Sequence, residues 1–500
     1  MVKRLSSIIL IIAIVLLHFN SMKVSATQLE IPTERLKKVD EYIQRQFKEA
    51  NIVGGTYAIV QKGKIVAAKG IGMSDIKMEK KATPETVYAA ASVTKALTAT
   101  AILQLQEQNK LSINDPVQKY IPWFTYKDKE KSKEITIKHL LTHSPGINRF
   151  EADASIFTDE KKNRDSLVNS IKALRTIELS SEPGEKGQYC NTCYNTLGLI
   201  IEKVSGMNYY DYMKTFLFQP LGMNNTGFGE DLQKMNSVPL AKEYSWFYGF
   251  RNTSIRNFQA FGKSQDPEGG IYTNALDLAK FVSATLGSNS VTLLNNKSLA
   301  FQGSVPTEEG TWKYTVGGFE LGTVKSQKAL YKGGDGIGSA SAILMLPEEE
   351  LGVVLMIGES NSEPKKEMAI GMMELLLGGE PQNIDSPAPL FKQVGYIMII
   401  ITLGSVLITG WVGRSIYARY KNQNKLVKHR WLNVFLSLIL LTLSTFIGYV
   451  LFTVRPTQIG FYGYPFDMAV GLICFECSII LSLAYNIYLI IYGVKYDYDL

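Results

Sequence analysis

The chain has 500 residues, which is longer than one average domain, and 46% of them are hydrophobic. Its net charge of +7 lies at the two ends: residues 1–26 carry +3 and residues 392–500 carry +5, which leaves −1 for residues 27–391. Because a nucleic-acid-binding domain needs a basic surface, the near-neutral middle of the chain excludes nucleic acid as an expected partner.

Residues 1–26 have the features of a secretory signal peptide. Lys3 and Arg4 precede an apolar run, and Val24-Ser25-Ala26 forms a small-residue cleavage site. An uncleaved membrane anchor is the alternative interpretation of the same run.

The domain expected over residues 27–377 begins with a helix and a hairpin. The stretch TERLKKVDEYIQRQFKEAN has apolar residues at helical spacing, with Thr33 as its expected N-cap. The next stretch, TYAIVQKGKIVAAKGIG, predicts two strands around a turn at Lys62-Gly63. Residues from about 72 to about 310 are expected to be mostly helix and loop.

The end of this domain predicts strands again. YTVGGFEL, KALYKG, SASAILMLP and LGVVLMIG are expected strands, and KEMAIGMMELLLG is an expected closing helix. The predicted fold class is therefore α+β, with an antiparallel sheet assembled from both ends of the domain, flanking helices and a largely helical insertion. A cleft between the sheet and the insertion is the natural place for a site.

After a tether at residues 378–393, three apolar runs follow at about 394–413, 432–452 and 468–493. At about 1.5 Å per residue, each run is long enough to cross a hydrocarbon core of about 30 Å. The loop RSIYARYKNQNKLVKHR has six Lys and Arg and no acidic residue, which predicts a cytoplasmic position. We therefore expect a multi-pass protein of the bacterial cell membrane, in contact with lipid, with an extracytoplasmic catalytic domain.

The first candidate for chemistry is Ser92-Val93-Thr94-Lys95, at the start of a predicted helix. Positions i and i+3 share a helix face, so the Ser92 hydroxyl and the Lys95 amine are expected to point the same way. A serine becomes a useful nucleophile when a base lies beside it, and an amine can help to supply that base. The alternative without a catalytic role is a serine that caps the helix, followed by a lysine on the surface.

Five further motifs follow along the chain, in the same order as in a known family. They are His139-Leu140-Leu141-Thr142-His143-Ser144-Pro145-Gly146, Tyr189-Cys190-Asn191, Pro220-Leu221-Gly222-Met223, Gly269-Gly270-Ile271 and Lys332-Gly333-Gly334. Together with the serine and lysine motif, they resemble the serine β-lactamases and penicillin-binding proteins, nearest the class C and esterase-like branch. The resemblance covers residues 33–376.

The resemblance implies catalytic roles for Ser92, Lys95 and Tyr189. Ser92 would form the acyl-enzyme, and Lys95 and Tyr189 would act as general base and acid, with the formal base left open. A phenol has a pKa near about 10, so the neighbouring Lys95 and Lys332 would have to favour its anionic form.

The same resemblance implies the binding residues. Asn191, Lys332 and Gly334 would bind substrate, and the backbone N–H groups of Ser92 and Asp335 would form the oxyanion hole. No cofactor is implied.

Three features depart from the pattern or leave alternatives open. Gly333 offers no hydroxyl to a substrate carboxylate, so we expect weak turnover of β-lactams. Cys190 and Cys193 form either a local disulfide or two thiols. His139 and His143 have the spacing of a metal pair but lack the glutamate of a zincin, so no metal is expected.

The resemblance implies a serine hydrolase acting on D-amino-acid peptides or on related amides and esters, with peptidoglycan-like material as the substrate class. A family domain followed by three membrane spans also resembles the peptidases that mature colibactin-type prodrugs, which is the first alternative. The second is a non-catalytic wall-binding or sensor module.

Overall fold

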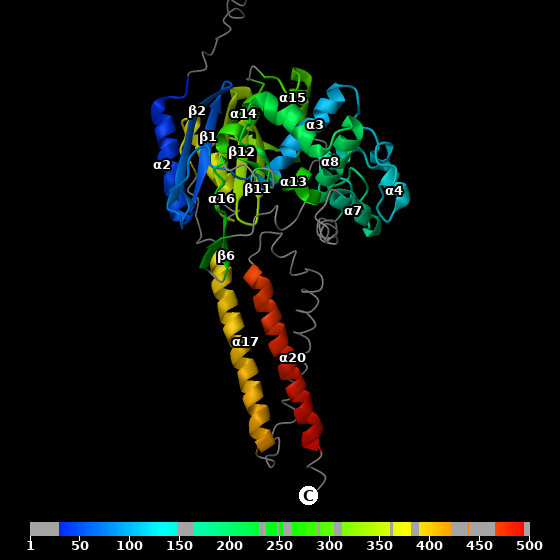
Figure 1. The fold of residues 1–500 in the computed structure, drawn as a ribbon, viewed down its shortest axis with the longest axis vertical. Coiled ribbons are helices and arrows are strands. Elements are labelled where there is room, and N and C mark those ends of the chain that lie inside the picture. The colour runs from blue at the N-terminus through cyan, green and yellow to red at the C-terminus, as the bar shows by residue number, and fades with distance from the viewer. Residues whose placement is uncertain are drawn as a thin grey trace, which may run out of the picture.

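Figure 1 shows the computed structural model of the chain, a mixed domain from which two long helices extend. The expected signal peptide and most of the second expected membrane span lie outside the described residues. The structure describes residues 30–147, 165–229, 232, 237–247, 250–253, 263–287, 291–304, 313–360, 364–381, 390–421, 439 and 466–494.

The framework of the domain is an eight-stranded antiparallel sheet in the order β3-β2-β1-β13-β12-β11-β10-β9. The first and last of its long strands are neighbours, which confirms a sheet built from both ends of the domain. The strands are β1 (Gly54–Gln61), β2 (Lys64–Asp75), β3 (Lys80–Lys81), β9 (Lys313–Tyr314), β10 (Glu320–Val324), β11 (Gln327–Asp335), β12 (Ala340–Leu346) and β13 (Leu351–Ile357).

The expected hairpin is confirmed in β1 and β2. Lys62 and Gly63, which join the two strands, have φ angles of 48° and 75°. Two consecutive positive φ angles give the backbone twist that matches a two-residue hairpin turn.

Helices cover one face of the sheet and close the domain. Helix α2 (Thr33–Glu49) packs against α16 (Pro364–Leu376), and both share a hydrophobic core with the sheet. The N-cap prediction was wrong, because Pro32 occupies that position and Thr33 is the first helical residue. Pro32 is extended, with φ −58° and ψ 137°, and no side-chain hydrogen bond caps the helix.

The opposite face carries α14 (Ala275–Thr285) and the helical insertion. Alternate residues of β1 point to opposite faces of the sheet. Tyr57 and Ile59 belong to the core under α2, whereas Ala58 and Val60 belong to the core of the insertion. At the centre of the insertion, α3 (Thr94–Glu107) packs against α8 (Asn191–Ser205), as Figure 1 shows.

The remaining short elements surround these two helices. The helices are α4 (Lys129–Glu134), α5 (Ile137–Leu141), α7 (Asp165–Ala173), α9 (Tyr209–Met213), α10 (Gln219–Leu221), α13 (Asp266–Gly269) and α15 (Asn296–Gln302). Single-turn segments are η1 (Ala91–Val93), η2 (Val117–Lys119), η3 (Leu174–Thr176), η4 (Lys214–Phe218), η5 (Lys263–Gln265) and η6 (Pro347–Glu349). The strands are β4 (Tyr88–Ala89), β5 (Gly227–Phe228) and β8 (Ile271–Thr273) in one small sheet, and β6 (Tyr244–Phe247) and β7 (Phe250–Thr253) in another.

Two long helices, α17 (Leu390–Lys421) and α20 (Phe466–Val494), lie side by side beyond the domain (Figure 1). Across the part of the chain that is described, no helix combines the length and the apolar character needed to span a bilayer. The three expected spans are therefore unsupported by the structure and stay a prediction from the sequence.

Candidate active site

Ser92 lies on a sharp turn between a strand and a helix. Strand β4 leads into η1, and α3 follows at Thr94. Ala91, directly before the serine, has a φ of 45°, a left-handed conformation that is uncommon for a residue with a side chain. This turn leaves Ser92 partly exposed, whereas Lys95 in the first turn of α3 is buried.

The structure brings the three residues expected to be catalytic together. Lys95 Nζ lies 3.0 Å from Ser92 Oγ, and the Tyr189 hydroxyl lies 2.6 Å from the same oxygen. Both groups are within the distance at which a base can take a proton from a serine. The i, i+3 spacing brings Lys95 to Ser92, while Tyr189 lies directly before Cys190, the N-cap of α8.

A fourth residue, Glu268, completes the contacts of Lys95. Lys95 Nζ donates to the Glu268 backbone oxygen at 2.8 Å and to its carboxylate at 2.6 Å. The Glu268 side chain is buried in α13. The sequence prediction missed this residue. Its position directly before the family motif Gly269-Gly270 could have indicated it.

Two lysines face the ring of Tyr189. Lys95 Nζ and Lys332 Nζ each lie 5.0 Å from the ring centroid, a cation–π distance. Lys332 is 1% exposed, and this burial lowers its pKa to about 8, against the opposing effect of the Glu320 carboxylate. The Lys95 charge lowers the pKa of Lys332 further.

His143 holds the segment that carries Tyr189. Its ring stacks on the Tyr189 ring with centroids 4.6 Å apart. The Cys190 N–H donates to His143 Nδ1 at 3.0 Å, and the Gln188 N–H donates to the His143 backbone oxygen at 2.7 Å. His143 therefore aligns the backbone on both sides of the tyrosine.

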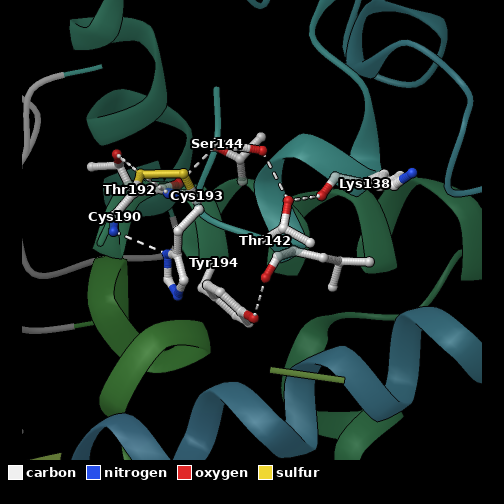
Figure 2. The surroundings of a disulfide bond; sticks show 10 residues. Lys138, Thr142, Ser144, Cys190, Thr192, Cys193 and Tyr194 are labelled. Carbon is white, nitrogen blue, oxygen red and sulfur yellow. Dashed lines mark hydrogen bonds between the residues drawn. A yellow bond between two sulfur atoms is a disulfide. The ribbon is translucent and has the colours of Figure 1, made fainter. Parts of the chain in front are cut away.

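Cys190 and Cys193 form a disulfide, which settles the alternatives left open by the sequence. Figure 2 shows the bond at the start of α8, beside Thr192 and Tyr194. Cys190 is the N-cap of this helix, and its sulfur accepts the Cys193 N–H at 3.0 Å. Both cysteines are fully buried, so the bond belongs to the core behind Tyr189.

Of the expected binding residues, Gly334 lies beside the serine turn. Asn191 is the first residue of α8 and is buried. Gly334 lies so close to the turn that an added Cβ would be 2.3 Å from the Ala90 oxygen and 3.0 Å from Ser92 N. A glycine is therefore required where β11 passes Ser92.

Asp335 ends β11, and its carboxylate accepts a hydrogen bond from Lys365 Nζ at 2.6 Å. The side chain thus points to α16, and only the backbone of Asp335 is available to the site. The N–H groups of Ser92 and Asp335 stay the predicted oxyanion hole.

Comparisons with known proteins agree on the family. The profile of the family described as Beta-lactamase matches residues 39–376. Protein flp of Staphylococcus aureus (strain MRSA252) is 29% identical over 332 residues, which is 65% of this chain and 63% of that protein. The "Putative penicillin-binding protein PbpX" of Bacillus subtilis (strain 168) is 33% identical over 269 residues, or 51% of this chain and 60% of that protein. The matched part spans less than two thirds of either relative.

A solved structure has a similar fold. The octameric penicillin-binding protein homologue from Pyrococcus abyssi superimposes with a TM-score of 0.61 and 26% sequence identity. The match covers 73% of this chain and 81% of that protein. With a family profile that spans more than half of its length, this chain belongs to the beta-lactamase family, whose characterised enzymes use a serine nucleophile.

Proposed function

We propose that the chain is a serine hydrolase that cleaves D-amino-acid peptides, or related amides and esters, through an acyl-enzyme on Ser92. The observation that carries this proposal is the position of Ser92 Oγ, within hydrogen-bond distance of both Lys95 and Tyr189. We also place the chain nearest the class C-like branch, on the Tyr189-Cys190-Asn191 motif.

The reaction proceeds in two halves. Ser92 Oγ bonds to the substrate carbonyl carbon while its proton passes to the base, and the carbonyl oxygen becomes an oxyanion. The N–H groups of Ser92 and Asp335 stabilise this oxyanion. The bond to the leaving nitrogen or oxygen then breaks, and the leaving group takes the proton from the base. Water repeats both steps on the ester, which releases the acid and restores Ser92.

The first experiment tests the acyl-enzyme. The purified full chain is treated with a fluorescent penicillin and with a fluorophosphonate, and the labelled residue is identified by mass spectrometry. We expect an adduct on Ser92 that the Ser92→Ala variant lacks and that the control Ser170→Ala, a buried serine on α7, retains. Equal labelling of Ser92→Ala would contradict the proposal, and no labelling by either probe would favour a wall-binding or sensor module.

The second experiment addresses the substrate. D-amino-acid amides, D-amino-acid esters, an acylated D-asparagine amide and nitrocefin are compared by kcat/KM. We expect a higher kcat/KM for the D-amino-acid substrates than for their L-isomers. Nitrocefin should have a low kcat/KM, because Gly333 carries no hydroxyl. A strong preference for the acylated D-asparagine amide would favour the prodrug-maturing alternative, which the apolar runs after the domain also support.

We further propose that residues 394–493 anchor the chain in the cell membrane with the catalytic domain outside. The support is the three apolar runs and the basic loop between the first two of them. Protease added to intact cells should remove the catalytic domain while the C-terminal segment stays in the carbonate-washed membrane fraction. Recovery of the full chain in the carbonate supernatant would contradict this proposal.

A further inference from the structure

The hairpin of β6 and β7 presents an aromatic side chain to solvent at the end of the domain that faces the long helices. Phe250, the first residue of β7, is 65% exposed although its side chain is large and apolar. Strand β6 contacts α17, and Figure 1 shows it beside the end of that helix nearest the domain. The hairpin therefore lies where the first expected membrane span begins.

The hairpin is attached firmly to the end of the main sheet. Arg251 Nε donates to the buried Glu359 carboxylate at 3.0 Å, and the Arg251 guanidinium lies 4.7 Å from the centroid of the Trp246 ring. At the base of the hairpin, the Tyr244 N–H donates to the Gly358 oxygen, directly after β13, at 3.0 Å. The exposed phenylalanine thus belongs to a hairpin that is fixed to the sheet.

A second loop with exposed apolar side chains lies next to this hairpin. The turn between β2 and β3 holds Ile76 and Met78, which are 45% and 73% exposed. The Ile76 N–H donates to the Tyr244 hydroxyl at 2.8 Å, and the Lys242 N–H donates to the Ser74 oxygen at 2.8 Å. Large apolar side chains exposed on neighbouring loops are typical of a surface that meets a partner.

Basic residues accompany these apolar side chains. Against the two carboxylates of Asp75 and Glu79 stand four exposed lysines, namely Lys77, Lys80, Lys81 and Lys242. Binding to the surface of an anionic bilayer requires both kinds of residue, because apolar side chains enter the headgroup region and lysines attract the lipid phosphates.

The adjacent helix α17 indicates what covers this surface. Its large apolar side chains are exposed along its length, as Ile400, Leu403 and Leu407 are. Tyr396, near the end of α17 closest to the domain, is also exposed, and tyrosine is enriched where a membrane meets water. A bilayer around α17 would therefore have its headgroup region at the level of the hairpin.

We propose that the β6–β7 hairpin and the β2–β3 turn together form a docking surface for an anionic lipid bilayer, which holds the catalytic domain against the membrane beside α17. Phe250, Ile76 and Met78 enter the headgroup region, and the four lysines face the lipid phosphates. This inference rests on the proposed membrane anchoring and adds an interfacial contact to it.

The docked hairpin also orients the active site. Glu243, directly before β6, is buried, and its carboxylate accepts the Ala89 N–H at 2.9 Å. Ala89 ends β4, the strand that leads to the turn of Ser92. The element that meets the bilayer is thus joined directly to the strand before Ser92, so docking fixes the direction in which the active site faces.

The test measures the membrane depth of single positions with a nitrobenzoxadiazole fluorophore. The full chain with Cys474→Ser and Cys477→Ser is labelled at Phe250→Cys or at Met78→Cys. It is then reconstituted into vesicles of phosphatidylcholine and phosphatidylglycerol that contain a lipid with a nitroxide high on its acyl chain. We expect emission at short wavelength and a loss of about half of the fluorescence to the nitroxide at both positions. A Tm close to that of the parent chain shows that each labelled protein is folded.

The matched control is a label at Phe216→Cys. Phe216 is also an exposed aromatic residue, and Gln104 donates to its backbone oxygen and to that of Leu293, shortly before α15. In Figure 1, α15 lies at the opposite end of the domain from β6. The label at this position should keep its fluorescence and emit as in water.

The lysines are tested separately. The variant Lys77→Gln/Lys80→Gln/Lys81→Gln should lower the quenching at position 250 by about half in the anionic vesicles. Its control removes the same charge from exposed lysines in and beside α4, which lies far from β6 in Figure 1, and should leave the quenching unchanged: Lys127→Gln/Lys129→Gln/Lys133→Gln.

Three results would overturn the inference. The first is water-like emission at position 250 in vesicles that keep the chain through a carbonate wash. The second is short-wavelength emission without quenching by the lipid, which would mean that a second copy or another protein covers the hairpin. The third is an equal effect of the two lysine variants. Release of the unmodified chain by carbonate is a different outcome, because it would reject the membrane anchoring itself.

Discussion

At the scale of single residues, burial controls the charge of Lys332. Because its pKa is lowered to about 8, the side chain is cationic below that pH and becomes neutral above it. We expect kcat/KM to fall about tenfold per pH unit above pH 8, when the positive charge beside Tyr189 is lost. A profile of the unmodified chain between pH 6 and 10 checks this, and a limb that begins above about pH 10 would contradict it.

Gly334 gives a second prediction at this scale. An alanine at this position would put its Cβ 2.3 Å from the Ala90 oxygen and 2.5 Å from Ser341 Oγ, so β11 or the serine turn must shift. A displacement of about 1 Å in a catalytic group can lower the rate about 100-fold, which is the loss of acylation rate we expect for Gly334→Ala.

Gly269→Ala is the matched control. Gly269 also lies beside the serine turn, but an added Cβ would meet Ala91 at 3.8 Å, an ordinary contact. Stopped-flow acylation by a fluorescent penicillin compares the two variants. Similar rates for both would show that the close approach of β11 is not required.

At the scale of one element, Cys190 is the N-cap of α8, with Tyr189 directly before it and Asn191 directly after it. A disulfide that closes a loop of about four residues stabilises the fold by only about 2 kcal/mol in the chain-entropy model. We therefore expect the Cys190→Ser/Cys193→Ser variant to lose a few degrees of Tm but to acylate about tenfold more slowly, because the backbone that positions Tyr189 loosens.

The measurement pairs calorimetry with acylation kinetics. A Cys474→Ser/Cys477→Ser variant controls for loss of sulfur, because these two free cysteines lie in α20, away from the site. An unchanged acylation rate with a lowered Tm would make the disulfide a stability element alone.

At the scale of the whole molecule, the two ends of the domain depend on each other. Strand β1 pairs with β13, and α16 packs on α2, so early and late segments share one core. Met372 in α16 is fully buried in that core. We expect Met372→Ala to lower the free energy of unfolding by about 2–5 kcal/mol and to leave Ser92 labelling intact at 25 °C.

Urea unfolding of the full chain, followed by tryptophan fluorescence, measures this loss. Ile370→Ala, at a half-buried position of the same helix, should cost less. Equal losses at the two positions would mean that α16 does not complete the core.

The sequence by itself determined the local features and their order. The spacing of Ser92 and Lys95 was sufficient because residues three apart meet on one helix turn. The turn at Lys62-Gly63 and the strands at both ends of the domain could be predicted, because the residue patterns that specify them extend over only a few positions.

Only the tertiary structure decided the environment of the site. The ion pair of Lys95 with Glu268 joins residues 173 positions apart, and the lowered pKa of Lys332 depends on burial by segments from the whole domain. The disulfide between Cys190 and Cys193 likewise required the backbone geometry at the start of α8. The ion pair and the lowered pKa depend on distances and solvent exclusion between remote segments, and the disulfide depends on a backbone conformation that the spacing of two cysteines does not specify; no local pattern in a sequence contains these properties.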